Sequence, residues 1–579
     1  MYLYMPGLLQ NPGQKFCETY YNYHAGIPPS EIITSSCDIS LSRVHEFTGK
    51  DHKVTIHKGV GDVSYFYLSF DGGTDCPVEV LYTIKSTDIV NDFSIKDRPP
   101  GFRLENAIPT AQRWIKECLD GHETHPKDTQ PRSYPTRLLK IQESSVRLVL
   151  PAGEDVSGPY AALSYCWGPN PSFLRLSASN LQTLRDGIPH SSLPLAFQEA
   201  IRVMRTIGIQ YLWIHAFCII NTGPGSDEDW KSEAMKMQEV YSNCLVNFTL
   251  STAPNLDHSC LECHHDTEKK EVRPFQAHVN PNDGDNRDAG PEDWVIRPSW
   301  YYSRGIQCQP LGKRAWALQE WFLVPRVVSL GRGGLFWDCN QIPSASETFP
   351  CGSLVGKAGY QDLESIWLSF LDKYSNFDLT YPDKDKLIAF SAIASKMGQA
   401  MNDVYIAVED HNSAAQIIKR IPSEICEEER KKQNRTPTWS WASIDGPVLG
   451  GLYMYSHDPT GIAEAKSYEL TLLDDSHPYE AVVYASLRIE AFCKEIELVT
   501  KQFNYPHLDA RFEILDEMPI KGHCVLLAAL IHFNLGGEEC AEGLILRKKG
   551  TAGEEMYARI GIFLLRLDKK STLANIFEQ

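Results

Sequence analysis

The chain has 579 residues, of which 42% are hydrophobic and 11% aromatic, and its formal net charge is −18. This is the composition of a globular protein, and the length predicts two or three domains. The negative charge argues against a general affinity for nucleic-acid phosphates or anionic membranes, which require a dense basic face. We therefore expect no nucleic acid and no membrane among its partners.

The beginning of the chain and its longest apolar runs carry no targeting or membrane signal. Pro6 and Gly7 interrupt the first ten residues, which also lack the positive charge of a secretory signal. The apolar runs at 211–220 and 524–533 are about half as long as a membrane-spanning helix. Sixteen scattered cysteines are typical of reduced thiols. We expect a cytoplasmic protein.

Patterns along the chain predict four regions. Residues 1–105 favour strands. Residues 106–345 are expected to form an α/β domain with a polar, exposed loop near 266–293. The last two regions are 346–435, predicted to be helical, and 436–579, predicted to be rich in strands.

The first strand and helix of the α/β domain are predicted between residues 160 and 208. The short apolar run Tyr160–Trp167 is typical of a buried strand. Apolar side chains then recur at helical spacing over Leu193–Ile207, with Ser192 as the expected N-cap and Gly208 as the stop.

Two further strands are predicted on either side of a second helix. The run Tyr211–Ile220 is almost wholly apolar, which suits a central parallel strand covered on both faces. Acids in Ser226–Asp229 open a helix that continues to Tyr241, and Leu245–Ala253 alternates like a third strand. This order predicts an α/β fold with a doubly wound parallel sheet, whose ligand sites lie beyond the carboxyl ends of the strands.

Two motifs in this region resemble the core of the fungal heterokaryon incompatibility (HET) family. They are Tyr160-Ala-Ala-Leu-Ser-Tyr-Cys-Trp-Gly168 and Gln210-Tyr-Leu-Trp-Ile-His-Ala-Phe-Cys-Ile-Ile-Asn221. The family pattern at the second motif reads Leu-Trp-Ile-Asp-x-Leu-Cys-Ile-x-Gln. This chain therefore has His215 where the family has an acid and Asn221 where it has glutamine.

Further blocks similar to the family extend on both sides of the two motifs. They are Arg113–Cys118, Tyr134–Leu139, Arg314–Glu320, Pro325, Arg326, Phe336–Cys339, Leu379, Thr380, Asp385–Leu387 and Pro437–Ser443. An ordered series of this kind is not expected by chance.

The resemblance implies a role in fungal nonself recognition and the programmed cell death that follows fusion of incompatible hyphae. It also implies a TIR-like or flavodoxin-like parallel sheet, because HET domains are considered distant relatives of TIR domains. Some TIR domains cleave NAD with a helix-borne glutamate. By that analogy NAD is the candidate substrate, and Glu233 is the candidate carboxylate that stabilises the ribosyl oxocarbenium centre.

The resemblance leaves the other molecules at the site open. No cofactor is assigned. The expected partner is either an incompatibility partner protein or a small-molecule ligand, and oligomers are compatible with both.

Two residues are candidate catalytic groups, and each has a structural alternative. His215 is either a general acid or base whose pKa is shifted by burial, or a hydrogen-bonded histidine of the core. Glu233 is either a catalytic acid or an early-helix carboxylate favoured by the helix dipole.

Six further residues are candidates for ligand binding, and they too have structural alternatives. Four lie at the end of the first predicted strand, where ligand sites form in such folds but where aromatic residues also simply pack. The other two carry opposite charges that either bind an anion or fix a second layer of the domain. The six are Ser164, Tyr165, Trp167, Gly168, Arg314 and Glu320. Arg314 is the candidate phosphate or carboxylate contact, whereas Cys166 and Cys218 are interpreted as structural thiols.

Two cysteine–histidine clusters contain residue types that bind zinc. They are Cys118, His122 and His125, and Cys260, Cys263 and His264. A structural zinc site needs four ligands held together, which neither cluster supplies by itself. We therefore expect no zinc.

The departures at His215 and Asn221 leave three functions open. The first is a death effector that binds or cleaves a nucleotide. The second is an enzyme of secondary metabolism in which His215 acts as general acid or base on a small organic substrate. The third is a non-catalytic interaction scaffold.

Overall fold

In the computed structural model the chain divides into two units, Met1–Gly359 and Tyr360–Gln579. The described residues are 104–121, 130–259, 302–332, 334–339, 373–401, 460–472, 482–497, 524–535, 537–549 and 556–567, with the short segments 37–38, 54–58, 65–70, 79–85, 275–281, 292–298, 345–346, 370–371, 421–422, 448–449 and 508–512 and the single residues Trp367 and Ile576.

One antiparallel sheet of the first unit joins the N-terminal region to the polar stretch near 266–293. Its order is β1-β11-β12-β4-β3-β2. The strands are β1 (Cys37–Asp38), β2 (Val54–Lys58), β3 (Tyr65–Phe70), β4 (Glu79–Lys85), β11 (Phe275–Pro281) and β12 (Glu292–Pro298). The prediction of an exposed loop is wrong for 275–281, because this segment pairs through its backbone with strands on both sides.

The second sheet of this unit is mixed, with a parallel centre. Its order is β15-β14-β13-β10-β7-β9-β5-β6-β8, in which β13, β10, β7 and β9 are parallel neighbours and the flanking pairs are antiparallel. The strands are β5 (Leu138–Ile141), β6 (Ser145–Val149), β7 (Tyr160–Ser164), β8 (Ile188–Pro189), β9 (Tyr211–Ile214), β10 (Val246–Leu250), β13 (Arg326–Gly331), β14 (Gly334–Cys339) and β15 (Ala345–Ser346). The predicted α/β class is confirmed, while the TIR-like or flavodoxin-like assignment stays a prediction.

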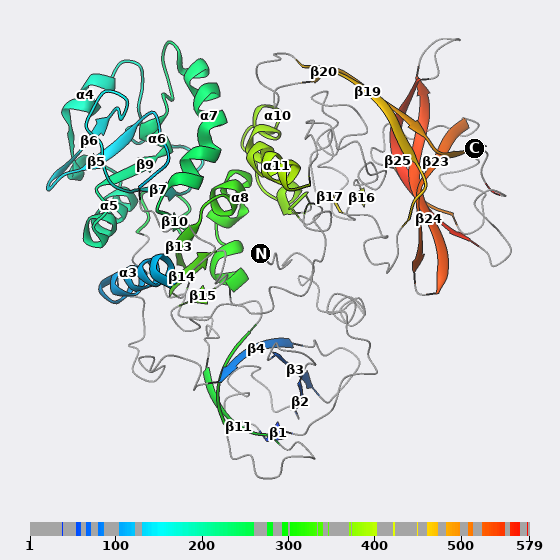
Figure 1. Cartoon of the computed structure of the whole chain (residues 1–579), viewed down its shortest axis with the longest axis horizontal. Coiled ribbons are helices and arrows are strands. Elements are labelled where there is room, and N and C mark those ends of the chain that lie inside the picture. Colours follow the sequence, from blue (N-terminus) through cyan, green and yellow to red (C-terminus); the bar gives the residue numbers. More distant parts are fainter. Residues whose placement is uncertain are drawn as a thin grey trace. The chain divides into compact units, whose positions relative to one another are not determined.

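Helices cover both faces of this sheet, as Figure 1 shows. They are α3 (Leu104–Gly121), α4 (Leu181–Asp186), η4 (His190–Ser192), α5 (Leu195–Ile207), α6 (His215–Cys218), α7 (Ser226–Asn243), η5 (Ser303–Gln307), η6 (Leu311–Lys313) and α8 (Ala315–Phe322). Trp114 of α3 and Phe197 of α5 pack with Leu163, Leu212 and Phe248 of the strands in one apolar cluster. The helices α7 and α8 lie on the other side of the sheet (Figure 1).

The helix α5 ends as predicted but begins differently. Gly208 adopts a left-handed conformation with φ 94° directly after the last turn, which a glycine adopts without steric cost. The N-cap residue is Pro194, and Ser192 does not cap the helix. The Ser192 hydroxyl instead donates to the carbonyl oxygen of Pro189 at 2.7 Å. Ser192 therefore stabilises the preceding turn.

The strand predicted over Tyr211–Ile220 is wrong beyond Ile214, where the chain turns into α6. The carbonyl oxygen of Cys218 accepts a hydrogen bond from Arg137 at 3.0 Å, and the amide of Ile220 donates to Asp229 at 2.7 Å. Because side chains satisfy these backbone groups, the chain leaves the sheet while it remains buried.

All five side chains of β10 are buried. Val246, Phe248 and Leu250 belong to the apolar cluster, as their alternation predicts. Asn247 and Thr249, which alternate with them, are buried as well. The second face of this strand is therefore covered too, so that polar groups there need hydrogen-bond partners within the protein.

The second unit contains two described helices followed by strands. The helices are α10 (Pro382–Asp385) and α11 (Ile388–Met401). The strands are β16 (Ile421–Pro422), β17 (Val448–Leu449), β18 (Thr460–Gly461), β19 (Glu464–Leu472), β20 (Val482–Glu490), β21 (Phe492–Glu497), β22 (Leu508–Phe512), β23 (Cys524–Leu535), β24 (Glu538–Lys549) and β25 (Met556–Leu567). Most form one sheet of order β18-β23-β24-β25-β22, with β21 beside β23.

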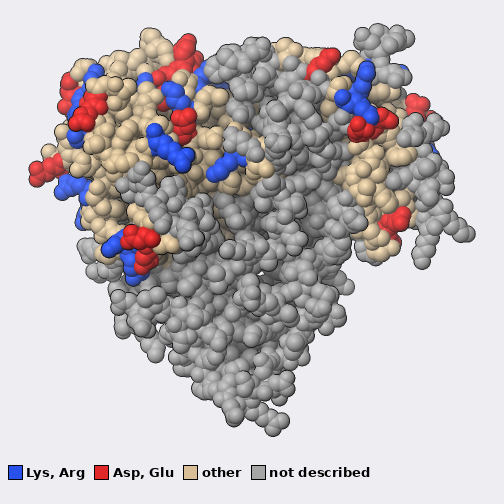
Figure 2. Space-filling view, in the orientation of Figure 1, with Lys and Arg blue, Asp and Glu red and all other residues tan. Residues whose placement is uncertain are grey.

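The two predicted C-terminal regions agree with this order of elements, except that β16 falls in the region predicted to be helical. The borders predicted for the four regions stay predictions. None of the described helices is both long enough and apolar enough to cross a membrane. In the view of Figure 2, positive and negative side chains are interspersed on the described surface.

Truncation of a leucine at the centre of the sheet should lower stability strongly. Leu212 of β9 is fully buried, so Leu212→Ala should lower the free energy of unfolding by about 2–5 kcal/mol through lost burial and the cavity left behind. Leu195→Ala is the matched control, because that leucine of α5 is 43% exposed and should change stability little. Urea unfolding of both variants measures the difference. Equal urea midpoints for Leu212→Ala and Leu195→Ala would contradict the placement of Leu212 in the core.

Candidate functional site

Several residues of the predicted site lie at the carboxyl ends of β7 and β9, including His215, which was predicted to lie within the second strand. The chain runs from β7 to its neighbour β9 and then to β10 on the other side of β7, so the strand order reverses at β7. In doubly wound sheets, ligands bind beyond the carboxyl ends of the strands at such a point. Tyr165–Gly168 directly follow β7, and His215 directly follows β9.

Arg314 ties α8 to the end of β7. It is the N-cap residue of α8, and its Nη1 donates to the carbonyl oxygen of Tyr165 at 2.7 Å. Its guanidinium also hydrogen-bonds the thiol of Cys166, and its charge acts on His215. We call Tyr165, Cys166, Trp167, His215 and Arg314 the strand-end cluster.

Tyr165 is a buried residue of the strand-end cluster. Its hydroxyl accepts a hydrogen bond from the amide of Ala216 at 3.1 Å, and its ring packs edge-on against Phe197 with centroids 4.9 Å apart. Burial raises the pKa of this hydroxyl, so it stays protonated at neutral pH. The position of Tyr165 is structural, because it links β7 to α6 and to the core.

Trp167 and Gly168 lie at the partly exposed edge of the strand-end cluster. The ring of Trp167 meets those of His215 and Phe173 edge-on, in both cases with centroids 5.6 Å apart. Gly168 has φ +81°, and a Cβ atom there would lie 2.7 Å from Cβ of Asn255. A glycine is therefore needed where the loop after β7 meets the loop after β10.

His215 carries a neutral imidazole. Burial, with a smaller contribution from the Arg314 charge, lowers its pKa from the usual range to about 4. Its Nδ1 is enclosed and has no hydrogen-bond partner among the described residues. The alternative of a hydrogen-bonded core histidine therefore finds no support at this nitrogen. A lone pair that is buried without a donor costs less free energy than an N–H group that is buried without an acceptor. The enclosed Nδ1 therefore favours the tautomer that has its proton on Nε2.

Ser164 and Glu320 belong to a buried polar network on the α7 and α8 side of the sheet. The amide nitrogen of Asn247 donates to Ser164 Oγ at 2.9 Å and to the backbone oxygen of Glu320 at 3.0 Å. The Glu320 carboxyl hydrogen-bonds Ser164 and Tyr241. Burial raises the pKa of the Glu320 carboxyl. The two hydrogen bonds and the charge of Arg314 lower this pKa, but by less than burial raises it. The network therefore fixes α8 and α7 to the strands.

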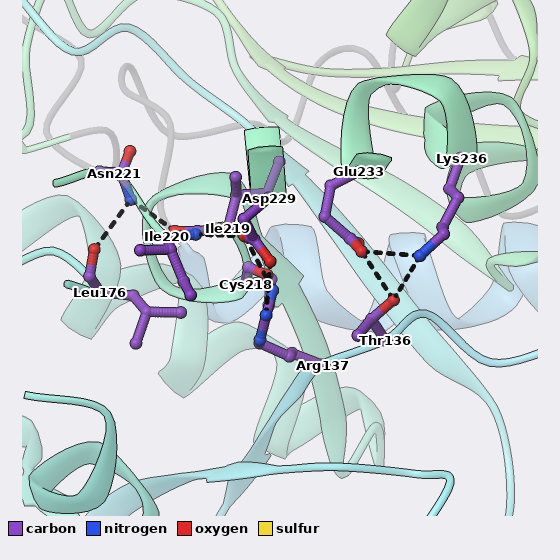
Figure 3. A network of polar contacts seen from close by, with 10 residues as sticks. All are labelled: Thr136, Arg137, Leu176, Cys218, Ile219, Ile220, Asn221, Asp229, Glu233 and Lys236. Carbon is purple, nitrogen blue, oxygen red and sulfur yellow. Dashed lines mark hydrogen bonds and ion pairs between the residues drawn. The ribbon is translucent and has the colours of Figure 1, made fainter. Parts of the chain in front are cut away.

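Glu233 lies in a different network, drawn in Figure 3. It is 3% exposed, and its Oε1 accepts hydrogen bonds from Thr136 Oγ1 at 2.8 Å and from Lys236 Nζ at 2.9 Å. No hydrogen bond or ion pair joins it to His215 among the described residues. The two predicted catalytic residues are therefore not linked directly by a polar contact in the described part of the chain.

Asn221 organises the turn after β9 (Figure 3). Its amide nitrogen donates to the backbone oxygens of Ile219 at 2.7 Å and Ala216 at 3.0 Å. The amide at this position thus satisfies backbone groups of α6 and holds the helix that begins with His215.

Several residues of these networks were not predicted from the sequence. The sequence pattern could have indicated Asn247, because it is a polar residue in a largely apolar strand. Arg137 pairs with Asp229 through two contacts of 2.6 and 3.1 Å, and Arg175 lies over the Trp167 ring with 5.4 Å to the centroid. No sequence spacing indicates either pair.

Cys166 and Cys218 are buried, which fits their interpretation as structural thiols. Burial raises the pKa of the Cys166 thiol and raises that of Cys218 to about 12, so both stay protonated at neutral pH. Cys118 lies 3.2 Å from Nε of Arg326. The other five cysteine and histidine residues of the two clusters lie outside the described residues. Within the described part, no three potential ligands are grouped to hold a metal.

Comparison with protein families identifies one match. Residues 160–320 match the family described as heterokaryon incompatibility protein (HET). The comparisons with curated proteins and with solved structures give no match. The family resemblance is confirmed for this range, which contains the strand-end cluster, Glu233 and Glu320, and it connects the chain with heterokaryon incompatibility. Of the further blocks, Arg314–Glu320 lies within the match, and the others lie outside it.

The low pKa of His215 should make stability depend on pH. The unfolded histidine takes up a proton near pH 6.5 and the folded one only near pH 4, so unfolding is favoured as the pH falls between these values. The loss should reach about 3 kcal/mol at most, because each pKa unit between the unfolded and the folded value is worth about 1.4 kcal/mol. His215→Gln should show a smaller loss in urea unfolding at pH 7 and pH 4.5. An NMR titration of His215 near pH 6.5 would contradict the enclosed imidazole.

Proposed function

We propose that this chain, whose residues 160–320 form a heterokaryon incompatibility domain, acts in heterokaryon incompatibility by binding a nucleotide at the strand-end cluster. NAD is the candidate ligand. The observation that carries the proposal is the meeting of Trp167, the neutral imidazole of His215 and the guanidinium of Arg314 at the carboxyl ends of β7 and β9.

The three side chains offer the contacts that a nucleotide needs. The partly exposed Trp167 presents an aromatic surface to a flat ring, and Arg314 supplies positive charge for a phosphate. His215 is uncharged at neutral pH and supplies a hydrogen-bond donor through Nε2. Together they suit a ligand that has both an aromatic ring and an anionic group.

Cleavage of NAD at this site would require a carboxylate near the ribosyl centre. Glu233 lies in the helix after the second strand, where the family analogy places the carboxylate, and it is paired with Lys236. Glu320 lies under the strand-end cluster, but burial raises its pKa and so favours the protonated form. By that analogy Glu233 stays the candidate for cleavage, while position favours Glu320 as a binding or acid group.

The decisive experiment is induced expression of the full chain in a fungal host, with cellular NAD and viability measured together. We expect both to fall in cells that express the wild-type chain. Glu233→Gln should restore both, because it removes the charge while it keeps the shape of the side chain. Glu228→Gln, an exposed glutamate of the same helix, is the matched control and should behave like wild type.

Each outcome assigns the carboxylate or rejects the proposal. Restoration by Glu320→Gln but not by Glu233→Gln would move the catalytic role to Glu320, provided that both variants unfold like wild type. Unchanged NAD together with normal growth would reject NAD cleavage. A purified chain that binds no NAD in calorimetry would reject nucleotide binding as well.

A second candidate function is chemistry on a small organic substrate by His215. It is favoured by the neutral imidazole, whose enclosed Nδ1 leaves Nε2 as the reactive nitrogen. A pKa of about 4 makes this histidine a weak base at neutral pH, so polarisation of a carbonyl by Nε2–H suits it better than proton abstraction. In this case His215→Gln would abolish the activity while Glu233→Gln would retain it.

A further inference from the structure

Arg175 lies in a segment between β7 and α4 that is fixed on top of α6. The neighbouring residue Leu176 is fully buried. Its amide donates to the oxygen of Ala216 at 2.8 Å, and its oxygen accepts from the amide of Asn221 at 2.9 Å. Two residues later, Ala178 donates to the oxygen of Thr222 at 3.1 Å. The backbone at Arg175 is therefore held in place beside the strand-end cluster.

The guanidinium of Arg175 lies over two aromatic rings at cation–π distance. Its Cζ is 5.4 Å from the ring centroid of Trp167 and 6.0 Å from that of Phe173. A cation–π contact engages the positive charge without using a hydrogen bond, so the N–H groups remain available for a bidentate acceptor. The aromatic contacts also limit the side-chain freedom that binding would otherwise remove.

No described residue occupies these N–H groups. Among the described residues, the side chain of Arg175 has neither an ion pair nor a hydrogen bond, and only its backbone oxygen is bonded, by Asn180. Other arginines of the domain do have carboxylate partners, as in the pairs Arg137–Asp229 and Arg147–Glu154. An arginine with no carboxylate partner in the described part of the chain is notable in a protein of net charge −18.

Arg314 is occupied to a greater extent than Arg175. One of its N–H groups binds the oxygen of Tyr165, and another contact goes to the thiol of Cys166. These contacts fix α8 to β7, so that part of its hydrogen-bonding capacity is directed into the protein. Of the two arginines, Arg175 therefore has the greater free capacity for an anion.

We propose that Arg175 is the principal anion-binding residue at the strand-end cluster and binds a phosphate group of the ligand, with Trp167 beside it. The identity of that ligand as a nucleotide rests on the function proposed above. Inorganic pyrophosphate has the same anionic chemistry without the ring and therefore tests the arginine separately.

The test is calorimetric titration of the full chain with NAD and, separately, with inorganic pyrophosphate. Arg175→Gln should weaken the binding of both probes about tenfold or more, because it removes a charge-assisted bidentate contact. Arg175→Lys should weaken it less, since it keeps the charge but not the planar fork. Arg202→Gln is the control, because Arg202 is an exposed arginine of α5 and should leave both affinities unchanged.

The outcomes separate this inference from the proposed function. Equal affinity of Arg175→Gln and wild type for NAD would overturn the assignment of Arg175 while leaving nucleotide binding intact. Binding of pyrophosphate that depends on Arg175, without any binding of NAD, would retain the anion site and overturn the nucleotide proposal. Failure of both probes to bind the wild-type chain would overturn both. Circular dichroism and thermal unfolding establish that the variants fold.

Discussion

The ion pair between Arg137 and Asp229 is the interaction on which the site depends. Its two contacts join the start of β5 to the first turn of α7, and both side chains are largely buried. The same two groups bond the oxygen of Cys218 and the amide of Ile220, and so close the turn after β9. A paired and hydrogen-bonded charge of this kind is costly to break, because the remaining partner is left uncompensated.

That turn determines where the candidate ligand contacts lie. It fixes α6, which begins with His215, and Asn221 then holds the end of the turn by its amide. The backbone of Asn221 also binds Leu176, beside Arg175. The loop after β7 and the turn after β9 are thus one hydrogen-bonded structure, although some forty residues separate them in the sequence.

The two faces of the central sheet differ in the polarity of their side chains. The α3 and α5 face is apolar, whereas the α7 and α8 face contains Ser164, Asn247 and Glu320 in a hydrogen-bonded network. Polar groups of this kind are tolerated in a core only when they are paired. The network therefore specifies how α8 packs, and through Arg314 it also fixes the end of β7.

Much of the fold was predictable, and the reasons are local. The apolar run at β7, the helical spacing along α5 and the glycine at 208 produce their elements through burial and backbone preference alone. The end of β9 was not predictable in this way, because an apolar run has the same pattern in a buried strand and in a buried turn. The partners that end it, Arg137 and Asp229, come from distant positions. The same holds for 275–281, where backbone pairing overrides a polar composition.

The sequence by itself determined the α/β class, the family of residues 160–320 and most of the residues that surround the site. Hydrophobic periodicity and local motifs carry that information. Only the tertiary structure decided that His215 is uncharged at neutral pH, that Glu233 is paired with Lys236, and that Arg175 lies over the Trp167 ring with no ion pair among the described residues. The physical reason is that burial, charge partners and stacking depend on distances between residues far apart in the chain, which no local pattern specifies.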